Sequence, residues 1–150
     1  MRLYVMRHGP AEDSSPSGRD FDRSLSAHGR TRTKLVAREL EKLGERPARI
    51  ISSPLRRAVQ TADIVAGVLG GTVEFSEQLA PSEAAPDIVR ELAGSAASVL
   101  VVGHAPDVSI LVVELIGKTI GFEPAMVVAV DIVPDRPAAE CFVLRPSALE

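Results

Sequence analysis

Residues 98–106, "SVLVVGHAP", join a buried strand directly to a glycine, a histidine and a proline. The run from Ser98 to Val102 is almost continuously apolar and β-branched, which is typical of a strand in a parallel sheet covered on both faces. Pro106 predicts the start of a helix. The inward face of that helix would consist of Val108, Leu111, Val112 and Leu115. A strand that leads straight into a helix indicates an α/β architecture.

The same alternation of strand and helix extends over the rest of the chain. Short apolar runs bounded by turn residues predict further strands at residues 3–6, 49–52, 72–75, 126–132 and 139–145. Apolar residues at helical spacing predict helices between Ser26 and Gly44, from Pro54 to Leu69 and from Pro86 to Leu92. The predicted fold class is therefore α/β, a three-layer α/β/α sandwich with a mostly parallel central sheet. The last two strands can form an antiparallel hairpin at one edge of that sheet.

Two of these helices show their inward faces in the sequence. Ser26 is a candidate cap for the first helix, in which Val36, Leu40 and Leu43 keep a helical spacing. The apolar stripe of the second helix is Leu55, Ala58, Val59, Ala62, Ala66 and Leu69. Residues 9–25 are rich in Gly, Pro, Ser and Asp and predict a surface loop, and a second loop is expected at 76–86.

Composition limits the class of protein. The 150 residues predict a single domain that spans 1–150. Cys141 is the only cysteine, which excludes a disulfide framework and favours a reducing, cytoplasmic location. No signal peptide is expected before the strand at 3–6, and no apolar run approaches the roughly 20 residues of a membrane span. The net charge of −3 and the aromatic content of 3% disfavour nucleic acid as a partner.

Polar side chains follow three of the predicted strands at the point where each strand ends. Arg7, His8 and Gly9 follow the first strand, residues 52–57 ("SSPLRR") follow the second, and His104 comes after the core strand. Because ligands of open α/β sheets bind beyond the carboxyl ends of the strands, these side chains are expected to converge. Arginine forks beside helix N-termini are typical of a phosphate pocket.

Two histidines in a phosphate pocket indicate covalent chemistry. A neutral imidazole is a good nucleophile toward phosphorus. Neighbouring arginines would stabilise the transition-state oxygens and would lower the pKa of a histidine, which keeps the ring neutral. The carboxylates that would hold magnesium are absent from all three strand ends, so neither a metal nor another cofactor is expected.

The three motifs resemble those of the histidine phosphatase superfamily, and within it the small phosphohistidine phosphatases of the SixA type. They are "RHG" at 7–9, "SSPLRRAVQTA" at 52–62 and "VGHAP" at 102–106. The resemblance implies a phosphoglycerate-mutase-like fold and a phosphatase in which His8 is the nucleophile and is transiently phosphorylated.

The resemblance also implies which residues bind the phosphoryl group. Arg7 and Arg57 would bind its oxygens, and His104 would donate a hydrogen bond to them, with Ala105 beside it. Arg23, in "DRSLSAHG" (22–29), matches a further family arginine, although Ser24 replaces the proline that usually follows it.

A general acid is harder to find. The larger members of the family place a Glu or Asp after the third strand, where this chain has Glu77, Glu83 and Asp87, none in a convincing motif. A phosphohistidine leaves as an imidazole, a better leaving group than an alkoxide, so a strong acid is dispensable. A chain of this length also has little room for a lid. Both points favour phosphohistidine in a partner protein as the substrate. The expected oligomeric state is a monomer or a weak dimer.

Two alternatives stay open. One is an enzyme for small phosphate esters, either a phosphomonoesterase or a mutase related to the phosphoglycerate mutases. The other is an inactive module that binds a phosphorylated ligand, although no motif residue is missing. His28 and Arg56 are expected to have no direct part in catalysis, and a zinc site is disfavoured because no two histidines have a short ligand spacing. The solvated face would include Arg19, Arg30, Arg32 and Lys34.

Overall fold

The computed structural model describes residues 1–82 and 85–150 and contains one six-stranded sheet. The strands, in chain order, are β1 (Arg2–Arg7), β2 (Arg49–Ser52), β3 (Val73–Phe75), β4 (Ser98–Gly103), β5 (Val127–Asp131) and β6 (Ala139–Leu144). Their order across the sheet is β3-β2-β4-β1-β5-β6. The first four strands are parallel, and β5 and β6 are antiparallel additions at one side. All six strands occur where the sequence predicts them, and the hairpin at the edge is confirmed.

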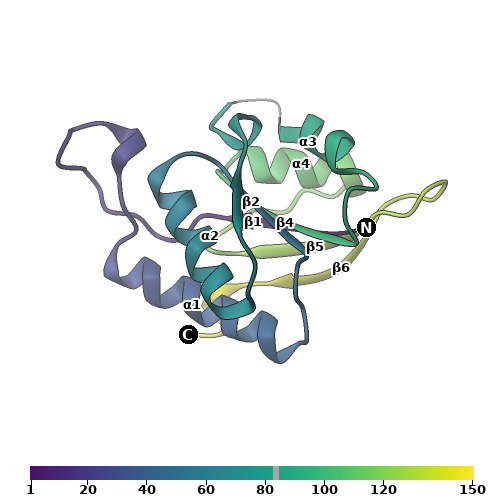
Figure 1. The fold of residues 1–150 in the computed structure, drawn as a ribbon, viewed down its shortest axis with the longest axis horizontal. Helices are drawn as coiled ribbons and strands as arrows, with labels where there is room; N and C mark the ends of the chain where they lie inside the picture. The colour runs from purple at the N-terminus through teal and green to yellow at the C-terminus, as the bar shows by residue number, and fades with distance from the viewer. Residues whose placement is uncertain (83–84) are drawn as a thin grey trace.

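Helices cover both faces of the sheet (Figure 1). The helices are α1 (Ala27–Lys42), α2 (Arg56–Leu69), α3 (Ala85–Leu92) and α4 (Asp107–Ile116). Helices α1 and α2 pack together on one face, and α3 and α4 pack together on the other. The predicted three-layer α/β/α sandwich is therefore confirmed.

Two apolar cores result from this layering, because strands buried on both faces send alternate side chains to opposite sides. Leu100 and Val102 of β4 lie in the core under α1 and α2, whereas Val99 and Val101 lie in the core under α3 and α4. All four are fully buried. This explains why the sequence of β4 is continuously apolar and does not alternate.

The first helix begins after Ser26 and ends before Gly44, as the sequence predicts, but one residue of its predicted apolar face is exposed. Ser26 is the N-cap of α1, and its Oγ accepts the N–H of Gly29 at 2.9 Å. Val36 and Leu40 are fully buried. Leu43, however, is 53% exposed, because it is the C-terminal cap of the helix and has turned away from the core.

The second helix begins later than predicted. We expected Pro54 to be its first residue, but α2 starts at Arg56. Leu55 is extended, and its N–H donates to Ser53 Oγ at 3.2 Å. Pro54 and Leu55 therefore belong to the turn before the helix and not to its first turn. Val65, which the predicted stripe omitted, is fully buried, whereas Val59 is only partly buried.

The two predicted loops contain short 3-10 turns. Loop 9–25 includes η1 (Asp20–Asp22), and the segment after β3 includes η2 (Glu77–Leu79). A third turn, η3 (Pro146–Ala148), lies near the end of the chain. In Figure 1, loop 9–25 projects beyond the carboxyl ends of the parallel strands. None of the helices in the described part of the chain is both long and apolar enough to cross a bilayer.

Candidate active site

The register of the sheet brings three strand ends level. β1 and β4 pair with Arg7 opposite Gly103, and the N–H of His8 donates to Gly103 O at 3.0 Å. The residue that follows each of these strands is a histidine, so the register places His8 beside His104. The centroids of the two rings are 5.0 Å apart. On the other side of β4, β2 ends at Ser52 and leads into α2 at the same edge.

The backbone that follows His8 fixes the orientation of its ring. His8 Nδ1 lies 2.7 Å from Gly9 O, and a carbonyl oxygen only accepts, so Nδ1 carries the proton. The neutral ring then has its lone pair on Nε2. The N–H of Gly9 donates at 3.0 Å to Thr61 Oγ1, whose own hydroxyl donates to Arg57 O at 2.8 Å. One buried threonine hydroxyl thus joins the His8 loop to the helix that carries Arg57.

Close packing behind His8 requires glycine at two positions. A Cβ at Gly9 would overlap Thr33 Oγ1 on α1, and a Cβ at Gly29 would overlap the carbonyl oxygen of Pro10. The first turn of α1 therefore lies directly against the backbone that holds His8. This contact explains the small residues on both sides of the interface.

His104 is almost completely buried, with 3% of its surface exposed. Its Nε2 lies 2.8 Å from Ser53 Oγ. Its Nδ1 is buried and has no hydrogen-bond partner among the described residues. A buried polar nitrogen without a partner is costly, so this atom is suited to binding a ligand oxygen.

Both histidines are held in the neutral state. Burial is the main cause, and it lowers the pKa of His8 to about 4 and the pKa of His104 to about 3. Nearby positive charge acts in the same direction, since Arg57 and Arg7 lower both pKa values. The hydrogen bond to Gly9 O opposes the effect at His8 but does not cancel it.

Two arginines flank the histidines. Arg57 is in the first turn of α2 and is only 6% exposed. Arg7 donates from one terminal nitrogen to Phe122 O at 2.8 Å, while its Nε is buried and unpartnered within the described residues. Burial lowers the pKa of Arg7. Helices α2 and α4 both begin at this edge without a side-chain cap, so their N–H groups add to the positive potential.

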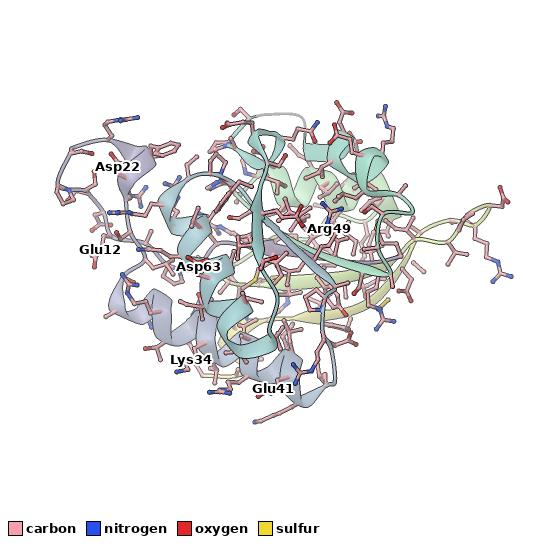
Figure 2. The ribbon with its side chains drawn as sticks, viewed as in Figure 1. Glu12, Asp22, Lys34, Glu41, Arg49 and Asp63 are labelled. Carbon is pink, nitrogen blue, oxygen red and sulfur yellow. The ribbon has the colours of Figure 1, made fainter. Side chains whose placement is uncertain are left out.

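Asp20 is a site residue that the sequence did not suggest. Its carboxylate accepts from Arg57 at 3.1 Å and from Arg23 at 2.8 Å, and its backbone oxygen accepts from Arg57 at 2.9 Å. Arg23 and Arg57 therefore lower the pKa of Asp20. Asp20 belongs to η1, on the same projecting loop as Glu12 and Asp22, which Figure 2 labels. Its spacing of three residues from Arg23 was the only available signal, and that spacing is common on any surface.

The structure brings together Arg7, His8, Arg57 and His104, and joins Arg23 to them through Asp20. Ala105 is exposed in the turn between β4 and α4. Arg56 is exposed, as expected, and His28 lies 3.8 Å from Glu150 at the far end of the sequence.

None of the proposed general acids is seen in contact with the histidines. Glu77 and Asp87 are exposed side chains on η2 and α3, and neither forms a hydrogen bond or ion pair with His8 or His104. Glu83 lies outside the described residues. The described site therefore brings together two neutral imidazoles, two flanking arginines and a carboxylate with a lowered pKa, a set that can bind a tetrahedral anion and attack it with nitrogen.

Comparison with known proteins identifies the family. The sequence model of the histidine phosphatase superfamily (branch 1) matches residues 3–84. An uncharacterized protein of Picosynechococcus sp. is 41% identical over 121 residues, which span 71% of this chain and 68% of that protein. The phosphohistidine phosphatase SixA of Escherichia coli (strain K12) is 32% identical over 121 residues, which span 77% of this chain and 74% of SixA.

The fold gives the same result. A solved structure of the protein histidine phosphatase SixA complexed with tungstate matches this chain with a TM-score of 0.91 at 27% identity, and the match covers 100% of both chains. The likeness confirms the phosphoglycerate-mutase-like fold that the motifs implied. The chain belongs to the histidine phosphatase superfamily, and its relatives and fold are of the SixA type.

Proposed function

We propose that this chain is a metal-independent phosphatase that removes the phosphoryl group from phosphohistidine in a partner protein. The observation that carries the proposal is the neutral His8 ring, which is flanked by arginines. Its centroid lies 5.0 Å from the centroid of the neutral His104 ring. A protonated histidine could not attack phosphorus, whereas a neutral one with a free Nε2 can.

In the proposed first step, His8 Nε2 attacks phosphorus in line with the leaving imidazole. A bond forms between Nε2 and phosphorus, the bond from phosphorus to the substrate nitrogen breaks, and the leaving nitrogen takes up a proton from solvent water. Arg7, Arg57 and His104 stabilise the negative charge on the equatorial oxygens. Arg23 and Ala105 would bind the substrate beside these residues.

In the second step, water attacks the phosphorus of phospho-His8. The new oxygen–phosphorus bond replaces the bond to Nε2, one proton is released, and inorganic phosphate leaves the neutral histidine behind. Neither step changes an oxidation state, and neither needs a metal in this scheme. The proton on Nδ1 stays on the ring throughout, because Gly9 O holds it.

The ionised state of Asp20 favours phosphohistidine over a phosphate ester. An ester leaves as a basic alkoxide and needs a proton donor. The carboxyl of Asp20 has a lowered pKa and would not be protonated near neutral pH, so it is a poor donor. An imidazole leaves without a strong acid. The resemblance to the phosphohistidine phosphatase SixA agrees with this choice.

The test is a side-by-side measurement of kcat/KM on a phosphohistidine-bearing protein, a phosphoserine peptide and a panel of small phosphate esters. We expect the phosphohistidine protein to be the best substrate, and EDTA to leave its turnover unchanged. Faster hydrolysis of sugar phosphates would make the chain a small-molecule phosphomonoesterase, and phosphate transfer between phosphoglycerates would make it a mutase. Binding without turnover of any substrate would make it a phospho-ligand binding module.

A further inference from the structure

We infer that Ser53 is a positioning residue that sets the tautomer of His104, so that the N–H of His104 Nδ1 is directed to the phosphoryl group. The two side chains come from neighbouring strand ends, and Ser53 Oγ lies 2.8 Å from His104 Nε2. Both are shielded from solvent, with exposed fractions of 0% and 3%. The catalytic consequence rests on the proposed function, whereas the tautomer does not.

The direction of this hydrogen bond follows from the other bond that Ser53 makes. Ser53 Oγ already accepts the N–H of Leu55 at 3.2 Å. Its hydroxyl proton still needs an acceptor, and His104 Nε2 is the one acceptor within hydrogen-bond distance in the described part of the chain. If Nε2 carried the proton, the fully buried Ser53 hydroxyl would have no acceptor, which costs about 1–3 kcal/mol.

The tautomer decides what His104 offers to a ligand. When Ser53 donates to Nε2, the proton of the neutral ring is on Nδ1. That nitrogen is buried and has no partner within residues 1–82 and 85–150. It then presents an N–H to a phosphoryl oxygen, whereas the opposite tautomer would present a lone pair and repel it. A donor fixed before the substrate arrives needs no reorganisation during the reaction.

The backbone holds both partners in place. The N–H of Ser53 donates to Val102 O at 3.0 Å, and His104 O accepts the N–H of Val108 at 3.0 Å. The strand register of β2 and β4 therefore fixes the distance between the serine and the histidine. Removing the hydroxyl should alter the proton position on His104 without moving the ring far.

The chain supplies a matched control at the neighbouring position. Ser52 is also fully buried, but its hydroxyl donates to Ser53 O at 2.8 Å and makes no bond to His104. The test compares Ser53→Ala, Ser53→Thr and Ser52→Ala by ¹⁵N NMR of the histidine side chains and by kcat and KM on the best phosphorylated substrate. Nitrogen shifts distinguish a protonated Nδ1 from a protonated Nε2.

We expect the wild type to show a protonated Nδ1 on His104, and Ser53→Ala to show a mixture of tautomers with kcat lowered about tenfold to a hundredfold. Ser53→Thr should restore both readouts, and Ser52→Ala should leave both at the wild-type values. A protonated Nε2 in the wild type, or an unchanged tautomer in folded Ser53→Ala, would overturn the inference. Absence of turnover in a wild type with a protonated Nδ1 would instead count against the proposed function.

Discussion

Asp20 places a carboxylate between Arg23 and Arg57, at a site suited to a phosphoryl anion. It binds both Arg23 and Arg57, so an incoming phosphoryl group has to compete with it for the same N–H groups. The arginines also keep Asp20 ionised by lowering its pKa. We therefore expect Asp20 to weaken the binding of free phosphate by competing for these N–H groups.

A substitution that keeps the acceptor and removes the charge tests this role. We expect Asp20→Asn to bind inorganic phosphate several-fold more tightly than the wild type, because the competing charge is gone while an oxygen still holds Arg57. Asp22→Asn is the control, since Asp22 lies on the same turn but pairs with Ser17. Isothermal titration with phosphate gives the dissociation constants. Weaker binding of phosphate by Asp20→Asn would contradict this expectation and show that the charge of Asp20 helps to hold the arginines in a binding position.

The ionisation of the two site histidines can be measured directly. Burial, assisted by the arginines, lowers the pKa of His8 to about 4 and that of His104 to about 3. An NMR titration should therefore find both rings neutral from pH 8 down to about 5. Arg57→Gln should raise the pKa of His8, because it removes a positive neighbour. Titration of His8 near its ordinary value of about 6.5 would contradict the described environment.

Individual elements show where sequence patterns predict the structure and where they do not. All strands were predicted because each is a short run rich in apolar residues with turn residues on both sides, although β3 and β6 are largely exposed or only partly buried. The N-cap at Ser26 was predicted because side-chain chemistry decides it locally. The start of α2 was not, because Ser53 Oγ, which binds the N–H of Leu55 just before the helix, also contacts His104 from a distant part of the chain. Asp20 was missed for the same reason, since only the folded loop brings it to Arg57.

The packing of α1 against the His8 loop gives a prediction at the level of elements. Gly29→Ala should destabilise the fold by about 1–3 kcal/mol and lower activity, because the new Cβ overlaps the Pro10 carbonyl and displaces the loop. Gly67→Ala on α2 is the matched control. A Cβ there meets no other atom within 4 Å, so alanine should stabilise the helix by about 0.5–1 kcal/mol. Urea unfolding gives both values, and an undisturbed Gly29→Ala protein would refute the contact.

For the whole molecule, the buried histidines predict acid sensitivity. The unfolded chain binds protons at these residues below about pH 6.5, whereas the folded chain binds them only near pH 3 to 4. Stability is therefore fully present above about pH 6.5, falls as the pH drops through this window, and levels off below it. Each pKa unit of difference corresponds to about 1.4 kcal/mol.

Replacing a buried histidine should flatten this profile. His104→Gln is expected to lose less stability than the wild type between pH 7 and pH 4, because one proton-linked group is gone. His28→Gln removes an exposed histidine and serves as the control. Urea unfolding at a series of pH values gives the slopes. Equal slopes for His104→Gln and the wild type would show that His104 is not the source of the acid sensitivity.

The central claim is that phosphoryl transfer passes through a covalent bond to His8. Rapid-quench labelling with a ³²P-phosphorylated histidine protein measures it most directly. We expect an acid-labile, base-stable phosphoenzyme in the wild type and in His28→Ala, and none in folded His8→Ala, whose turnover should also be lost. A phosphoenzyme that persists in His8→Ala, or wild-type turnover with no trapped intermediate at any quench time, would contradict the account.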